Sequence, residues 1–222
     1  MVNKKITITI FTSDYSVFTI LRIAEERYMQ MKQTSKKEQT RKRIIEATIE
    51  GVKQHGYGGL GVDAIAKSAK VTSGAFYGHF KSKKEAFEAA TLSGMVDLVD
   101  GLSYWRDTKG DSWLVPFIDW YLDIEHRKDI CGGCALPGLS VDVSRSEKEV
   151  HVAYESQLVQ AVKIITSGLP GSNTNKKKKI AWSILSTLSG AVIMSRAVDD
   201  EKIASEIAEA AKQKAKYLMT EK

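Results

Sequence analysis

Apolar residues return at intervals of three and four positions along most of the chain after residue 36, the spacing of a helix that buries one face. Over 38–55 this face comprises Ile44, Ile45, Thr48, Ile49 and Val52. A shorter face follows at Val62, Ile65, Ala66 and Ala69. Lys70 and Val71 interrupt the period, which resumes through Ala75, Phe76 and Tyr77. We therefore expect one helix over 38–55 and then two short helices joined by a tight turn.

Capping residues stand at the ends of these predicted helices. Gly56 suits the position after a helix C-terminus, where a positive φ is common. Gly61, Thr72 or Ser73, and Ser82 each precede a predicted helix and suit its N-cap. Two short helices joined in this way form a helix-turn-helix, whose second helix enters the major groove of DNA.

The chain keeps the helical period beyond Ser82, so we expect an all-α fold. Further helices are predicted over 83–99, 113–125, 147–167, 180–198 and 199–219. The basic run 176–179 is expected in the loop before the fourth of these. No apolar run reaches the roughly 18 residues of a membrane span, so no membrane partner is expected.

The first 35 residues form an N-terminal extension with a different pattern. Ile6, Ile8 and Ile10 alternate with threonines, the period of a strand. The extension is open to three interpretations: a disordered arm or a mis-assigned translation start, an extra helix on the DNA-binding domain, or a functional segment. Whether residues 1–28 belong to the native protein stays open.

Charge is distributed unevenly. The net charge of the 222 residues is +6, yet 36–84 alone holds eleven Lys and Arg against four Asp and Glu. A basic module beside a nearly neutral remainder favours nucleic-acid binding over a merely solvated lysine-rich surface. Two cysteines and no convincing secretory signal make a reducing cytoplasm the expected compartment.

The stretch 64–84 resembles the TetR/AcrR family of bacterial transcription regulators. The family pattern is roughly D-I-A-x-x-A-G-V-S-x-G-x-x-Y-x-H-F-x-S-K-E, and about eleven positions agree. Ala64 and Lys70 depart from it, and Lys70 replaces a turn glycine that prefers positive φ, at about 1 kcal/mol. The segment 132–150 is similar to part of the regulatory domains of one branch of this family.

The resemblance implies a three-helix DNA-binding domain over 36–98 and a larger effector-binding and dimerisation domain over 99–222. It implies a ligand-responsive repressor of a palindromic operator, with no cofactor and no enzyme activity. Because one short recognition helix makes few base contacts, we expect a homodimer through the last two helices, about 180–219. The small-molecule effector is unknown, as is the choice between repressor and activator.

Candidate site residues fall into two groups. The expected DNA contacts are Thr40, Arg41, Gly61, Val62, Thr72, Ser73, Gly74, Ala75, Tyr77, His79 and Lys83. The ligand-pocket candidates are Trp105, Trp113, Phe117, Trp120, Tyr121, Cys134 and Trp182, which are also what a packed core would contain. His126 and His151 are expected to be partly exposed surface residues.

Cys131 and Cys134 form a C-x-x-C pair. No second ligand pair at zinc spacing accompanies it, and the βαβ context of a thioredoxin is missing, so no metal is expected. The pair is interpreted as structural or pocket-lining, and the alternative is a thiol-based redox-sensing regulator that uses both cysteines. A general DNA-binding protein without a ligand and a helical enzyme remain the rival classes.

Overall fold

The computed structural model describes residues 36–220, and the chain divides into two compact units, Met1–Thr40 and Arg41–Lys222. The predicted extension 1–35 lies outside the described residues. Only residues 36–40, the beginning of helix α2 (Lys36–Gly59), are described in the first unit. All regular elements among the described residues are helices, which confirms the all-α class.

Helix α2 presents the predicted face to the core. Ile44, Ile45, Thr48, Ile49 and Val52 are all buried. The helical path is broken at Gly56, which has φ 70° and ψ 162°. A positive φ costs glycine little because it has no Cβ, so the predicted end of the helix is confirmed, and one further turn reaches Gly59.

Two short helices follow, as the pattern predicted. Helix α3 is Val62–Ser68 with Gly61 as N-cap, and α4 is Ser73–Tyr77 with Thr72 as N-cap. Ile65, Phe76 and Phe80 are almost fully buried beneath them. These apolar side chains fix both helices on α2 and on the start of the next helix.

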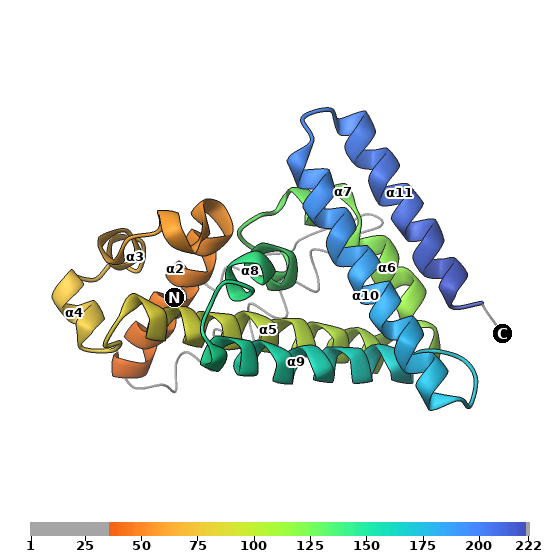
Figure 1. The fold of residues 1–222 in the computed structure, drawn as a ribbon, viewed down its shortest axis with the longest axis horizontal. Coiled ribbons are helices and arrows are strands. Elements are labelled where there is room, and N and C mark those ends of the chain that lie inside the picture. Colours follow the sequence, from red (N-terminus) through yellow and green to blue (C-terminus); the bar gives the residue numbers. More distant parts are fainter. Residues whose placement is uncertain (1–35, 221–222) are drawn as a thin grey trace, which may run out of the picture. The chain divides into compact units, whose positions relative to one another are not determined.

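Helix α5 is Lys83–Lys109 and begins at Ser82, whose side chain accepts a hydrogen bond from the Glu85 amide. The predicted end at residue 99 was wrong by ten residues, because Leu102 and Trp105 continue the buried face of the helix. Figure 1 shows α5 leading from α3 and α4 toward α6, with α9 alongside it.

The single helix predicted over 113–125 was also wrong. A 3₁₀ turn (η1, Gly110–Ser112) precedes two short helices, α6 (Leu114–Tyr121) and α7 (Ile124–Lys128). The helix breaks because Asp123 adopts extended backbone and its carboxylate accepts from the Glu125 amide, which caps a new helix. The chain then enters α8 (Ala135–Val143).

Three longer helices complete the chain. They are α9 (Lys148–Ser167), α10 (Thr174–Ala197) and α11 (Glu201–Leu218). The run 176–179 lies in the first turns of α10 and not in a loop, because the Asn173 side chain caps that helix at Lys176. Helices α10 and α11 pack against each other (Figure 1).

The buried residues form two clusters that meet along α5. One holds α2, α3, α4 and the first turns of α5 together, with help from α8 and the start of α9. The other is formed by the rest of α5 with α6, α9, α10 and α11. Helix α10 is long and apolar enough to cross a membrane, but Ile184, Leu185 and Leu188 are buried in this core, and core helices often pass that test.

Candidate nucleic-acid interface and the adjoining core

The turn between α3 and α4 confirms the expected strain at Lys70. Its φ is 56°, and it is the only residue other than glycine with positive φ among residues 36–220. The Val71 amide donates to the Ala66 oxygen (2.9 Å), and the Lys70 amide to the Lys67 oxygen (3.1 Å). This is a Schellman ending, which places Lys70 where glycine is usual.

Local hydrogen bonds fix the start of α4. The Thr72 hydroxyl accepts from the Ala75 amide at 3.1 Å, a standard N-cap. The Ser73 hydroxyl donates to the Asp63 carboxylate of α3 at 2.6 Å. These two bonds determine the angle at which α4 leaves α3, and they occupy hydroxyls that were predicted to face DNA.

The outward side of α4 is small and open. Thr72, Gly74, Ala75 and Tyr77 are exposed, with Tyr77 at 57%. A Cβ built on Gly74 would meet only the Thr72 hydroxyl, at 3.8 Å, and one built on Gly61 would meet nothing within 4 Å. The backbone here can therefore approach a large surface such as a DNA groove closely.

Aromatic residues anchor this surface from below. Phe76 and Phe80 are 0% and 1% exposed, with ring centroids 5.8 Å apart. Tyr77 packs edge-on against Phe76 at 5.4 Å, which leaves its hydroxyl end outside. The Arg41 guanidinium lies 4.8 Å from the Phe80 ring, so Arg41 adjoins the turn between α4 and α5.

The other predicted contacts have mixed surroundings. Lys83 Nζ donates to the backbone oxygens of Tyr57 (2.9 Å) and Leu60 (3.1 Å) and lies over the Tyr57 ring. Most of its donors are thus committed within the protein. His79 is half-buried, and its Nδ1 is buried with no hydrogen-bond partner among residues 36–220. Val62 is half-buried, and Thr40, in the first unit, donates to the Lys36 oxygen.

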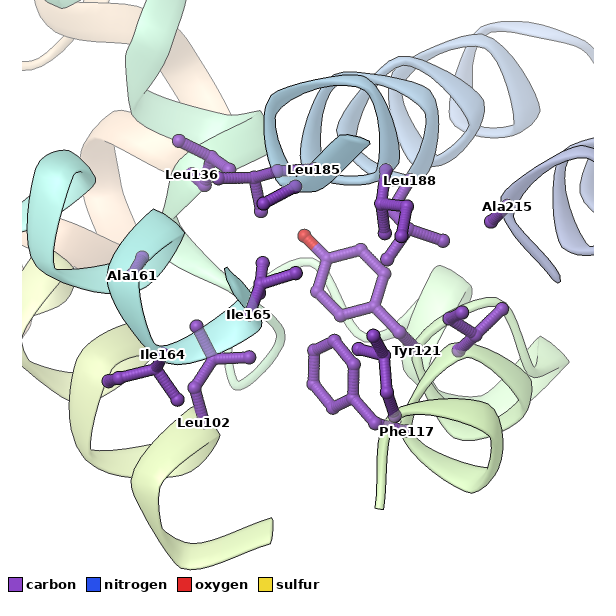
Figure 2. Packing of buried hydrophobic residues seen from close by; sticks show 14 of the residues in the cluster. Leu102, Phe117, Tyr121, Leu136, Ala161, Ile164, Ile165, Leu185, Leu188 and Ala215 are labelled. Atoms are coloured by element: carbon purple, nitrogen blue, oxygen red, sulfur yellow. The ribbon is translucent and has the colours of Figure 1, made fainter. Parts of the chain in front are cut away.

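The pocket candidates gather in the second cluster. Trp113, Phe117 and Tyr121 are fully buried, Trp105 is nearly so, and Trp120, Cys134 and Trp182 pack against them partly buried. Rings of Trp105, Phe117, Trp120 and Tyr121 form a chain of contacts with centroids 5.5–6.0 Å apart between successive partners. Figure 2 shows Phe117 and Tyr121 side by side among leucine and isoleucine side chains.

The expectation that His126 lies at the surface was wrong. It is 9% exposed, its Nδ1 lies 2.7 Å from the Tyr121 oxygen, and its Nε2 accepts from the Cys134 amide at 3.3 Å. Burial lowers the pKa of His126 to about 4, so the ring is neutral, as these two bonds require. His151 is exposed, as expected.

Two basic residues that the pattern did not single out hold the loop 129–134 between α7 and α8. Lys53 of α2 donates through Nζ to the backbone oxygens of Cys131 (2.9 Å) and Gly133 (2.6 Å). Arg196 of α10 donates to the oxygens of Arg127 (2.7 Å) and Asp129 (3.0 Å). A Cβ at Gly138 would come within 2.8 Å of the Lys53 stem, so only glycine admits Lys53 here.

The loop therefore connects the helix-turn-helix side of the unit with α10. The one available sequence signal was the combination of a mid-helix lysine on the buried side of α2 with a glycine-rich loop far along the chain. No local rule joins two segments so far apart. Among residues 36–220, no group of three or more His, Cys, Asp or Glu side chains could hold a metal ion.

A capped helix-turn-helix with an open outer face, joined through a long helix to a separate helical core, defines a helix-turn-helix DNA-binding protein. Residues 44–90 match the family model described as bacterial regulatory proteins, tetR family. Residues 44–90 therefore form a DNA-binding segment of the TetR family, and the chain is a transcriptional regulator of that type.

Known proteins resemble different lengths of the chain. An uncharacterized HTH-type transcriptional regulator of Lactococcus lactis, encoded in the lacX 3′ region, is 25% identical over 72% of this chain and 85% of its own length. The regulator SrpR of Pseudomonas putida is 40% identical over 29% of this chain and 30% of its own length.

Solved structures agree in fold. A TetR-family regulator from Cytophaga hutchinsonii superposes with a TM-score of 0.68 at 20% identity, covering 86% of this chain and all of the other. At this identity the likeness concerns the fold alone.

Proposed function

We propose that this regulator is a ligand-responsive repressor that binds a palindromic operator as a homodimer. The observation that carries the proposal is α4, a short capped helix with exposed small residues, flanked by basic side chains. Arg41 lies over the Phe80 ring, and Lys67, Lys70 and Lys81 are exposed just before and just after α4 in the chain. Small residues permit close approach to base edges, and these basic side chains supply the phosphate contacts that dominate affinity.

We assign the base-facing role to Thr72, Gly74 and Ala75, and phosphate contacts to Tyr77, His79 and Arg41. Gly61, Val62 and Thr40 lie at or near helix N-termini, which we propose to face the phosphate backbone of the DNA. Ser73 positions α4 through Asp63. Lys83, with its bonds to Tyr57 and Leu60, supports the domain in place of touching phosphate.

The dimer contact is proposed on the outer faces of α10 and α11. Helix α11 packs inward through Ala204, Ala208, Ala211, Ala215 and Leu218. Its outer face and that of α10 expose Ile193, Met194, Ile203 and Tyr217 at 40–58%. Two adjacent helices with apolar outer positions can form a four-helix bundle with a second copy, which removes these side chains from water.

The two proposed functions are assigned to the two buried clusters. Residues 36–98 would read DNA, and 99–222 would bind the effector and dimerise, with α5 and the loop 129–134 connecting them. The dimer would have one arrangement in which both α4 helices fit the operator and another in which they do not. An effector that binds the second arrangement more tightly would lower operator affinity, at most by the ratio of its affinities for the two arrangements.

Operator selection tests the proposal. The full chain is used to select duplexes from a random library, and the selected site is footprinted. We expect a palindrome whose halves lie about one helical turn, or a multiple of it, apart and a Tyr77→Ala variant that binds it about tenfold more weakly while remaining dimeric. Unchanged affinity in Tyr77→Ala would show that Tyr77 does not contact the operator. If the selected duplexes shared no common sequence, specific binding would be refuted.

A second candidate is redox sensing by Cys131 and Cys134. It is favoured by the position of both cysteines on the loop that Lys53 holds, and by the partly exposed Cys131, whose sulfur lies 2.6 Å from Gln54 Nε2. It is opposed by Cys134, because burial raises the pKa of its thiol.

Peroxide would oxidise the two thiols to a disulfide and be reduced to two waters. If redox sensing operates, peroxide lowers operator affinity in the wild type and leaves a Cys131→Ser variant unaffected. Equal responses in both proteins would refute it.

A further inference from the structure

Two polar groups of the second core, the Tyr121 hydroxyl and the Trp113 indole N–H, are buried without a hydrogen-bond partner among the described residues. Tyr121 is 1% exposed, and its hydroxyl has no hydrogen-bond partner among the described residues. Figure 2 shows the hydroxyl directed away from Phe117 and toward Leu185. Burial holds the pKa of Tyr121 well above its usual range, so the group is a neutral phenol with a proton to donate.

Such a group needs an explanation, since buried polar side chains nearly always find partners. The thiol of Cys134 lies close enough to interact with the hydroxyl, but a thiol is only a weak hydrogen-bonding group. The next phenol, Tyr154, already shares a 2.8 Å hydrogen bond with Ser140. A phenylalanine at position 121 would preserve the packing of the ring, so the hydroxyl contributes nothing to that packing.

Two cations, Lys53 and Arg196, lie near the Cys134 thiol. Lys53 and Arg196 both act on the Cys134 thiol, and Arg196 also acts on Tyr121, in the direction that favours negative charge there. The carboxylates that act on these cations are Asp129 on both and Asp97 on Lys53. Asp129 also accepts from the Gly132 amide. Burial lowers the pKa of both Lys53 and Arg196, because desolvation disfavours their charged forms.

We propose that the Tyr121 hydroxyl anchors the effector and that the effector is an apolar molecule ending in a carboxylate. The carboxylate accepts the phenol proton as a hydrogen bond within the field of Lys53 and Arg196. The apolar body replaces contacts among side chains such as Leu102, Ile165 and Leu188, which surround the ring (Figure 2). This inference rests on the proposed function, because it names the class of effector.

The position of the carboxylate would explain how binding reaches DNA. Cys134 is the last residue of the loop 129–134, and Tyr121 lies beside Cys134. Two backbone oxygens of the same loop accept hydrogen bonds from Lys53 of α2. A carboxylate beside Cys134 competes with the two loop oxygens for the Lys53 ammonium. The loop and α2 would then separate, and α4 would move with α2 through the cluster that contains Phe76 and Phe80.

The experiment uses the full chain with three acids, hexanoate, decanoate and phenylacetate, each beside its corresponding alcohol. Thermal shift and isothermal titration are measured for the wild type and for Tyr121→Phe. Tyr104→Phe, which removes a hydroxyl from a half-buried tyrosine of α5, is the matched control. A carboxylate that binds should lose about ten- to a hundredfold in affinity in Tyr121→Phe and keep its affinity in Tyr104→Phe.

Tyr121→Phe should also melt at a higher temperature than the wild type without any acid, because it removes an unpartnered buried hydroxyl. A lower melting temperature would mean that the hydroxyl is satisfied within the protein, and would overturn the inference. Binding of the alcohols as tight as that of the acids would overturn the anionic end, and no binding of any acid would overturn the effector class. Operator binding by the unliganded wild type is measured separately, so failure here is distinguishable from failure of the proposed function.

Discussion

The helix-turn-helix and the loop 129–134 are both irregular segments that hold helices in place, but they are held differently. Around the helix-turn-helix, the partners are close in sequence: Thr72 bonds to Ala75, and Ser73 to Asp63. Around the loop, Lys53 and Arg196 come from helices 80 and 67 residues away from the oxygens that they bind. A locally closed motif can keep its shape while it docks on DNA, whereas a loop held from afar can be released by a change in either distant helix.

The largest expected effect is a loss of folding stability at acid pH, caused by His126, which accepts a hydrogen bond from the Cys134 amide at the end of the loop. The folded state holds His126 neutral with a pKa of about 4, against an ordinary value near 6.5. Below pH 6.5 the unfolded chain therefore binds a proton that the folded chain does not, and stability falls as the pH drops toward 4. We expect this residue to cost about 3 kcal/mol over that range.

Urea denaturation of the wild type and of His126→Gln across pH 4–7 measures this term. The difference between the two proteins should shrink by about 3 kcal/mol toward low pH. His151→Gln, which alters an exposed histidine, should follow the wild type. Parallel pH profiles for all three proteins would show that His126 is not buried neutral.

The next largest effect is expected from Lys53→Met, which keeps the stem and removes the ammonium. The oxygens of Cys131 and Gly133 lose their donor, at a cost of about 2 kcal/mol. Hydrogen exchange should show faster opening of residues 129–134 but not of α4. Lys67→Met, at an exposed position of α3, is the control. Unchanged exchange in the loop would mean that Lys53 does not hold it.

These two loop contacts show what the sequence could not supply. The N-caps, the turn and the buried face of α2 follow from residues within one or two helical turns, and Gly56, Gly61, Thr72 and Ser82 were placed correctly. The break at Asp123 is a local N-cap that the apolar period concealed, whereas the extension of α5 through Trp105 depends on packing against distant helices. For the same reason, the aromatic candidates could be named but Lys53, Arg196 and the buried state of His126 could not.

A smaller effect is expected from Thr72→Ala, which removes the cap of α4. The Ala75 amide loses its acceptor, and the free energy of unfolding should fall by about 1 kcal/mol. Chemical denaturation measures it, and Thr72→Ser should restore most of the stability because serine also caps. Equal losses in both variants would show that the methyl group, and not the hydroxyl, matters.

The smallest effect should have the opposite sign. Lys70→Gly relieves the positive φ at the turn, at the expense of a more flexible unfolded chain, for a net gain of about 0.5–1 kcal/mol. The melting temperature should rise by a few degrees. Lys67→Gly, within α3, should instead lower it. A loss of stability in Lys70→Gly would mean that the Lys70 side chain contributes more than its backbone costs.

The central claim is that the outer face of α4 binds the operator, and one substitution tests it directly. Ala75→Glu adds a negative charge to that exposed face, and Gln160→Glu makes the same change of charge on an exposed position of α9. Affinity for the selected palindromic duplex is measured by fluorescence anisotropy for both variants and the wild type. We predict a loss of at least about a hundredfold for Ala75→Glu and almost none for Gln160→Glu. Wild-type affinity in a folded Ala75→Glu variant would contradict the assignment of α4 to DNA.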